Sequence, residues 1–241
     1  MTYRLKIRRG RGGGESFWQS FDTPCAGRDT VAAALEELNG RPALMDCTGA
    51  AARPVVWERA CLEKKCGACA MVIGGAPALA CATALEDAAD KSGTVTLAPL
   101  AKFPRIEDLQ VDRAGMFRAL EDMALWLEQD ADFTDERRRA LHYKAAGCLQ
   151  CGLCLEVCPN FDGRGAFAGA AAVAAAFRVL DENETGEHAA AVEKAYERRV
   201  FAGCAKSLAC QRICPAGVPV ERLLVKSNAA AVWHRKERKR K

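Results

Sequence analysis

The chain lacks the features that mark several broad classes of protein. Its net charge is only +4 over 241 residues, too small an excess to indicate nucleic-acid binding. No apolar run is long enough to cross a bilayer, and the nearest, residues 165–180, is short and rich in alanine. The first residues are polar and basic, without the apolar core of a secretory signal. We therefore expect a chain that stays in the cytoplasm and has no transmembrane segment of its own.

Histidine is also scarce, whereas cysteine is abundant. His142, His188 and His234 are scattered, and we interpret them as surface residues. The thirteen cysteines, in a reducing cytosol, indicate metal binding rather than disulfides. All but Cys25 and Cys47 fall into three tight groups, and we expect these two to be buried structural thiols.

The first half of the chain has the patterns of strands and the second half those of helices. Alternating or short apolar runs predict strands at residues 3–9, 16–21, 70–73, 77–81 and 94–97. Thr30 is the expected N-cap of a helix over residues 30–38. After a proline-marked segment, helical spacing dominates, with helices expected over 165–180 and 187–201. We expect an α+β protein with domains at residues 1–108 and 109–241.

The first cysteine group lies in the strand-rich half. Cys61, Cys66, Cys69 and Cys81 follow the spacing C-x4-C-x2-C-x11-C, and the first three match the ligand loop of plant-type [2Fe–2S] proteins. A hairpin around Gly74-Gly75 would return Cys81 to the loop that carries Cys69. A structural zinc site or free core thiols are the alternatives, but zinc usually uses two C-x2-C units and this group contains only one.

The other two groups lie in the helical half and repeat each other. Cys148, Cys151, Cys154 and Cys158-Pro159 form the bacterial ferredoxin run C-x2-C-x2-C-x3-C-P, whose last cysteine ligates the other cluster in two-cluster proteins. The second run has the same spacing but a serine at its second position, and consists of Cys204, Ser207, Cys210 and Cys214-Pro215.

Crossed ligation assigns a cluster to each run. A [4Fe–4S] cluster is expected on Cys148, Cys151, Cys154 and Cys214. Cys158, Cys204 and Cys210 then lack a fourth thiolate, which favours a [3Fe–4S] cluster. The alternative is a four-iron cluster whose last corner is held by the oxygen of Ser207.

With these motifs the chain resembles the iron–sulfur subunits of succinate dehydrogenases and fumarate reductases. The order of the three groups carries the resemblance, together with the connecting residues Pro99-Leu100, Phe103-Pro104-Arg105, Asp108-Leu109 and Val111-Asp112-Arg113. The resemblance implies a β-grasp, plant-type ferredoxin-like domain followed by an all-helical, bacterial ferredoxin-like domain.

The resemblance also implies the function of the chain. It would be the electron-transfer subunit of a membrane-bound succinate:quinone oxidoreductase, without a substrate site or catalytic residues. Single electrons would pass between the FAD of a flavoprotein subunit and the quinone or haem b of a membrane subunit. The complex would lie on the cytoplasmic face of the cell membrane. The alternative is an iron–sulfur wire for a related flavoprotein reductase with another donor or acceptor; a free ferredoxin or redox sensor is a third, non-enzyme interpretation.

Two departures from the family pattern bear on these expectations. Residues 62–65 of the first loop are Leu-Glu-Lys-Lys, where many members have arginine and glycine. Asn160-Phe161-Asp162 follows Pro159, and Ala205 follows Cys204, where members with a quinone site beside the three-iron cluster have aromatic residues and a histidine. The second departure favours the branch that has a single di-haem cytochrome b membrane subunit and typically uses menaquinone.

Overall fold

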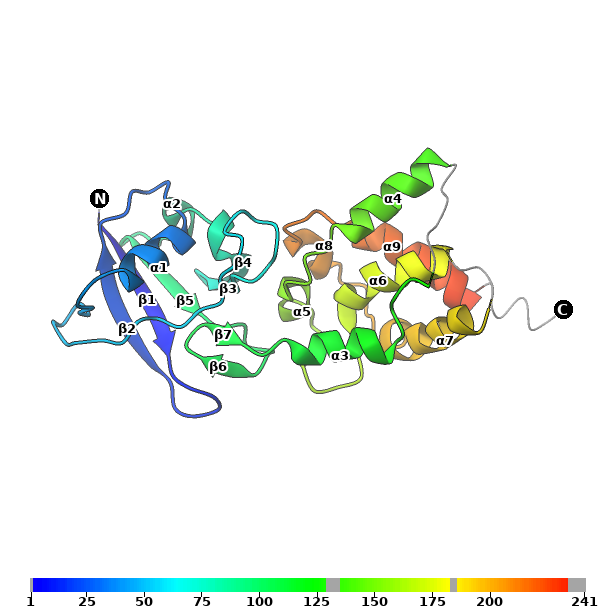
Figure 1. Ribbon diagram of the computed structural model, residues 1–241, viewed down its shortest axis with the longest axis horizontal. Helices are drawn as coiled ribbons and strands as arrows, with labels where there is room; N and C mark the ends of the chain where they lie inside the picture. The colour runs from blue at the N-terminus through cyan, green and yellow to red at the C-terminus, as the bar shows by residue number, and fades with distance from the viewer. Residues whose placement is uncertain (1, 129–134, 183–185, 234–241) are drawn as a thin grey trace. The chain divides into compact units, whose positions relative to one another are not determined.

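The computed structural model describes residues 2–128, 135–182 and 186–233, and its chain divides into two compact units (Figure 1). The first unit is Met1–Asp112 and the second is Arg113–Lys241. The first contains a mixed sheet and the second contains helices, so the expected α+β class is confirmed.

A five-stranded sheet with the order β2-β1-β5-β3-β4 forms the centre of the first unit. Its strands are β1 (Tyr3–Arg9), β2 (Phe17–Thr23), β3 (Ala70–Ile73), β4 (Ala76–Leu79) and β5 (Thr94–Ala98). β1 and β5 are parallel, and the other neighbouring strands are antiparallel. The strands expected from the sequence are therefore all present, with ends shifted by a few residues.

Apolar and charged residues alternate along β1, and this alternation explains which face of the sheet is buried in the core. Leu5 and Ile7 are fully buried, whereas Arg4, Lys6 and Arg8 between and beside them are exposed. Helix α1 (Val31–Asn39) supplies buried Leu35 and Leu38 to the same core, and it begins at Thr30 as predicted. The Thr30 side chain caps the helix by accepting a hydrogen bond from the Ala33 N–H. A 3-10 turn, η1 (Ala80–Ala82), and a short helix, α2 (Leu85–Ala88), precede β5.

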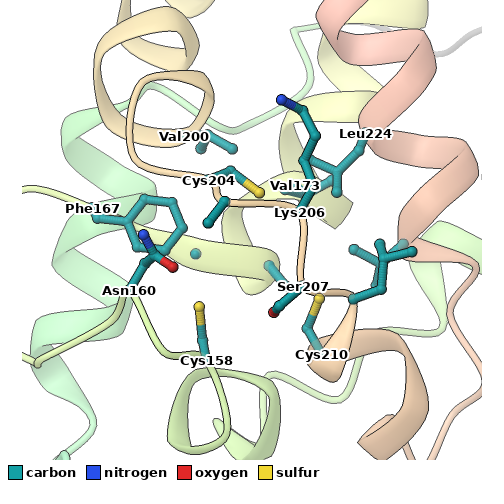
Figure 2. Close-up of a pocket in the computed structure, with 15 residues that line it drawn as sticks. Cys158, Asn160, Phe167, Val173, Val200, Cys204, Lys206, Ser207, Cys210 and Leu224 are labelled. Atoms are coloured by element: carbon teal, nitrogen blue, oxygen red, sulfur yellow. The ribbon is translucent and has the colours of Figure 1, made fainter.

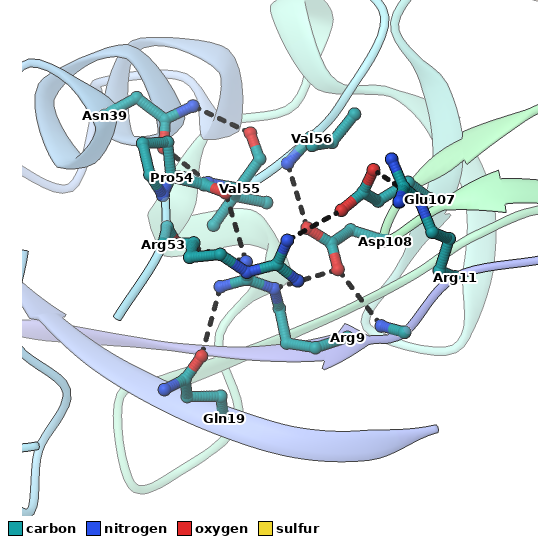
Figure 3. Close-up of polar contacts among 11 residues, drawn as sticks. Arg9, Arg11, Gln19, Asn39, Arg53, Pro54, Val55, Val56, Glu107 and Asp108 are labelled. Carbon is teal, nitrogen blue, oxygen red and sulfur yellow. Dashed lines mark hydrogen bonds and ion pairs between the residues drawn. The ribbon is translucent and has the colours of Figure 1, made fainter. Parts of the chain in front are cut away.

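A buried ion pair ties the last hairpin of the first unit to its first strand (Figure 3). The hairpin consists of β6 (Arg105–Glu107) and β7 (Gln110–Val111). Asp108 lies in its turn, 3.0 Å from Arg9 Nε, and it also accepts hydrogen bonds from the backbone N–H groups of Gly10 and Val56. The two charged side chains are 4% and 1% exposed, so each depends on the other for compensation. The hairpin containing residue 108 thus belongs wholly to the first unit.

The second unit is built around the long helix α6 (Gly169–Glu182). The other α-helices are α3 (Ala114–Asp122), α4 (Glu136–Ala146), α5 (Leu153–Glu156), α7 (Glu187–Tyr196), α8 (Ala209–Ile213) and α9 (Val220–Asn228). Two π-helical turns, η2 (Glu197–Phe201) and η3 (Ala229–Trp233), continue α7 and α9. Alanines on α6 allow close packing, and Ala172 and Ala176 are fully buried. Within the described ranges, no helix has the length and apolar character that a membrane crossing requires.

Candidate iron–sulfur sites

The first cysteine group comes together in the first unit as the hairpin prediction required. Strands β3 and β4 pair in register, and Gly74 and Gly75 form the turn with φ of +58° and +85°. Cys81 follows in η1, where its Sγ lies 3.3 Å from Cys69 Sγ. The hairpin therefore returns the last cysteine to the loop that carries the other three.

Backbone N–H groups of this loop point at the sulfurs. Cys61 Sγ accepts hydrogen bonds from the N–H groups of Glu63 and Lys65, both at 3.3 Å. Cys81 Sγ accepts one from Lys64 at 3.3 Å. Leu62 and Lys64 adopt left-handed backbone conformations, with φ of 54° and 60°, to turn these donors inward. The loop is therefore prepared to stabilise negative charge on sulfur.

The two sides of the first site differ in how easily their thiols ionise. The N–H groups of Glu63 and Lys65 lower the pKa of Cys61 to about 7. Burial instead raises the pKa of Cys69 to about 12. Half-buried Cys61 thus becomes a thiolate more readily than Cys69, whose thiolate needs the positive charge of a bound metal centre.

One pocket of the second unit is lined by four cysteines from both runs. Cys148 follows α4, Cys151 precedes α5 and Cys154 lies on α5, and these three share the pocket with Cys214 at the end of α8. Burial raises the pKa values of Cys148, Cys151 and Cys154. Residues sixty or more positions apart in sequence therefore share one thiol-lined space, in the combination that crossed ligation predicts.

A second pocket is lined by the other three cysteines and Ser207 (Figure 2). Figure 2 shows the sulfur atoms of Cys158, Cys204 and Cys210 directed into the same space, with the hydroxyl of Ser207 among them. Phe167 forms one wall and packs so closely on Gly203 that a Cβ at that glycine would lie 2.6 Å from the ring. Because Gly203 has no side chain, the Phe167 ring can pack beside Cys204 and form this wall of the pocket.

The two runs repeat each other in backbone conformation as well as in spacing. Gln150 and Lys206, each two residues after the first cysteine, have φ of 49° and 58°. Gly152 and Leu208 occupy the next equivalent positions, with φ of 84° and 55°. The loop that presents Ser207 thus has the left-handed positions of the loop that presents Cys151. The sequence did not reveal this, because glycine, the usual signal for such positions, occurs at only one of the four.

The donor sets fit iron–sulfur clusters. All thirteen cysteines are free thiols rather than disulfides. Among the described residues, no three or more histidine, cysteine, aspartate or glutamate side chains converge in a way that would hold a single metal ion. In the helical unit the thiols line pockets, as ligands around a multi-iron core do, and all-thiolate donor sets are those that such clusters take.

Two interpretations of single residues were wrong. His142 is not a surface residue but is 5% exposed, and the side chain of His188 is only 11% exposed. His234 lies outside the described residues. Cys47 is exposed and Cys25 is half-buried, so neither is the buried thiol that we expected. Isolated residues carry no periodic pattern, and their burial depends on which elements pack over them.

Models of two protein families match the chain. A "2Fe-2S iron-sulfur cluster binding domain" matches residues 4–118, which include the first cysteine group. A "4Fe-4S dicluster domain" matches residues 144–218, which include both cysteine runs.

Named relatives and a solved structure agree with these matches. The chain is 34% identical to the succinate dehydrogenase iron–sulfur subunit of Bacillus subtilis, over 84% of this chain and 81% of that protein. It is 30% identical to the fumarate reductase iron–sulfur subunit of Wolinella succinogenes, over 67% and 71%. A chain of the Mycobacterium smegmatis Sdh1 complex in the apo form has the same fold, with a TM-score of 0.74, 17% identity and 95% of each chain covered.

Proposed function

The chain belongs to the family of iron–sulfur subunits of succinate dehydrogenases and fumarate reductases, and from this membership we propose that it carries single electrons through three clusters. It works as the electron-transfer subunit of a succinate:quinone oxidoreductase. Its partners are a flavoprotein subunit and a membrane-anchor subunit.

The sorting of cysteines between the two pockets of the helical unit carries this proposal. Four thiols in one pocket and three thiols with a serine in the other match a [4Fe–4S] and a [3Fe–4S] cluster. A [2Fe–2S] cluster on Cys61, Cys66, Cys69 and Cys81 completes the set. The first unit is then a β-grasp, plant-type ferredoxin-like domain, and the second a helical, bacterial ferredoxin-like domain.

The residues of this chain hold the clusters and tune them. When bound, the clusters accept and release one electron at a time, while the two-electron interconversion of succinate and fumarate belongs to the FAD of the flavoprotein. The N–H groups of Glu63, Lys64 and Lys65 lower the cost of added negative charge at the first site. Burial raises the pKa values of Cys151 and Cys154, so the thiolates of the four-cysteine pocket would depend on the positive charge of the bound irons.

The proposed location of the complex and the type of its anchor subunit are inferred from membership of the family. The complex lies on the cytoplasmic face of the membrane, where the anchor subunit exchanges electrons between this chain and quinone. Asn160 lines the three-cysteine pocket where members with a nearby quinone site have an aromatic residue. This favours an anchor of the di-haem b type and menaquinone.

Iron analysis of the anaerobically purified complex tests the proposal. We expect about nine non-haem irons per chain, with a three-iron electron paramagnetic resonance signal when oxidised and an added two-iron signal on reduction by succinate. Cys66→Ser is expected to disturb only the two-iron signal, because both helical-unit pockets lack that thiol. Zinc in place of iron and acid-labile sulfide would contradict the proposal, and iron clusters that succinate does not reduce would assign the chain to another flavoprotein.

A further inference from the structure

The chain reaches the first cysteine group through a stretch without regular secondary structure. In the part of the chain that the structure describes, no helix or strand lies between α1 and β3. Residues 53–57, which we call the approach segment, lead to Cys61 and include Val55 and Trp57, which are 2% and 8% exposed. A buried segment outside a sheet needs other partners for its backbone N–H and C=O groups.

Side chains from separate elements supply these partners (Figure 3). Arg9 of β1 donates hydrogen bonds from Nη2 to the carbonyl oxygens of Arg53 and Pro54, both at 3.1 Å. Asn39, the last residue of α1, accepts a hydrogen bond from the Val55 N–H at 2.7 Å and donates one to the Val55 carbonyl at 2.8 Å. The approach segment is therefore paired with side chains where a strand would be paired with its neighbour.

Asp108, in the turn of the β6–β7 hairpin, holds the next residue of the segment. Its Oδ2 accepts a hydrogen bond from the Val56 N–H at 3.0 Å, and the N–H of neighbouring Leu109 donates to the Val56 carbonyl at 3.1 Å. Asp108 Oδ1 lies 3.0 Å from Arg9 Nε, so the two buried charges compensate each other. The carbonyl groups of residues 53–56 thus all have a partner from β1, α1 or the hairpin.

The approach segment ends close to the cluster loop. After buried Trp57, only residues 58–60 precede Cys61. The Cys61 sulfur accepts hydrogen bonds from the N–H groups of Glu63 and Lys65, which stabilise negative charge on it. A shift of the approach segment would move Cys61 relative to these donors and to the other three thiols of the group. The side chains that hold the segment therefore determine where the first ligand lies.

We propose that Arg9, Asn39 and Asp108 are positioning residues, which hold Cys61 in place for the two-iron cluster through the approach segment. The inference rests on the proposed function, because it concerns that cluster. Arg9 does more than compensate the charge of Asp108, since a second nitrogen of its guanidinium reaches the two carbonyl groups. An ammonium has a single nitrogen and cannot occupy both places. Lysine at position 9 therefore keeps the charge and loses the contacts to the segment.

A redox titration of the purified complex, followed by paramagnetic resonance, tests the proposal with Arg9→Lys. We expect the reduction potential of the two-iron cluster to fall, because displaced N–H groups at the Cys61 sulfur stabilise the added electron less. The potentials of the two clusters in the second unit should not change. Arg4→Lys is the matched control and should keep the natural potential, since Arg4 lies on the same strand but is half-exposed and bonds to Asp22.

A milder variant gives a second test, which holds even if Arg9→Lys fails to assemble. Asn39→Ala removes both hydrogen bonds to Val55 without changing a charge, and alanine suits the end of a helix. We expect the two-iron signal to be lost about tenfold faster in the presence of an iron chelator, because two hydrogen bonds are missing. Amide hydrogen exchange should become faster in residues 53–60 and stay slow in the strands of the sheet.

Three results would contradict these expectations. A natural potential in Arg9→Lys, or a natural rate of iron loss in Asn39→Ala, would overturn the inference alone. Faster hydrogen exchange throughout the first unit, with a natural two-iron potential, would also overturn it, because these side chains would then stabilise only the fold. A natural complex that gives no two-iron signal on reduction with dithionite would overturn the proposed function as well.

Discussion

The two cysteine runs of the helical unit share a backbone and differ in one donor atom. Both turn through left-handed positions at equivalent residues, Gln150 and Gly152 in the first and Lys206 and Leu208 in the second. The Ser207 oxygen lies 3.5 Å from the Ala209 N–H, and Cys151 accepts a hydrogen bond from the equivalent N–H, that of Leu153. The loop around Ser207 thus retains the conformation of a ligand-presenting loop while its donor has changed.

Under the proposed function, this difference means that the donor atom, and not the fold around it, sets the type of cluster in each pocket. A hydroxyl is a much harder ligand than a thiolate and must lose a proton from a far weaker acid before it binds iron. A pocket with three thiols and one hydroxyl therefore favours three irons, although its backbone suits four ligands. Substitutions that remove or change a single donor side chain test whether the two pockets differ in this way.

Replacement by alanine of Cys214 or Cys158, the cysteine that each run contributes to the pocket of the other, should have the largest effect. Cys214→Ala leaves three thiols in the four-cysteine pocket, so its cluster is expected to lose about one iron per chain and to add a second three-iron signal. Cys158→Ala leaves only two thiols in the other pocket and should remove that cluster, with loss of about three irons per chain and of the natural three-iron signal. Each variant is the control for the other, and iron analysis with paramagnetic resonance gives both readouts. Loss of the three-iron signal in Cys214→Ala alone would mean that each run binds its own cluster.

Conversion of the serine should have the next largest effect. Ser207→Cys completes the second set of thiols on a backbone that already suits it, so we expect one more iron per chain and loss of the three-iron signal from the oxidised protein. Ser207→Ala is the control and should keep the three-iron signal. If Ser207→Ala instead lowered the iron content, the serine oxygen would be a ligand in the natural protein.

Backbone changes should have smaller effects that show whether the two loops are strained alike. Gly152→Ala places a side chain at φ of 84° and should lower the free energy of unfolding by about 1 kcal/mol. Denaturation by guanidinium, followed by the visible absorbance of the clusters, gives the measurement.

Glycine in place of Gln150 or Lys206, the first left-handed residue of each loop, should instead raise the free energy of unfolding. Lys206→Gly and Gln150→Gly relieve left-handed strain at φ of 58° and 49° and should raise that free energy by about 0.5 kcal/mol each. Clearly unequal effects at these two positions would show that the loops are not equivalent.

Local features of the fold and site were predictable because neighbouring residues decide them. The alternation of β1, the Thr30 cap and the Gly74-Gly75 turn are found where the sequence placed them. Cys61, Cys66 and Cys69 are held in one loop by their short spacing, so their common site follows from the chain itself. The return of Cys81 required only one hairpin.

Features that depend on distant partners were not predictable in the same way. Arg9 and Asp108 are ninety-nine positions apart in the sequence, where nothing distinguishes either from an ordinary surface charge. They become a buried pair because the β6–β7 hairpin packs on β1. His142 has no motif that signals burial, and only the approach of α6 places Asp181 and Glu182 against its ring. No local pattern records which helices pack together.

The sequence by itself determined which atoms are available to bind metal in this protein, because the spacing of cysteines along a short loop limits which thiols reach a common centre. Tertiary structure alone decided which surroundings the side chains have: the burial of Cys151, the ring that packs against Gly203 and the carboxylates beside His142. The physical reason is that covalent connectivity acts over a few residues, whereas burial and electrostatic compensation arise only when distant segments share the same space.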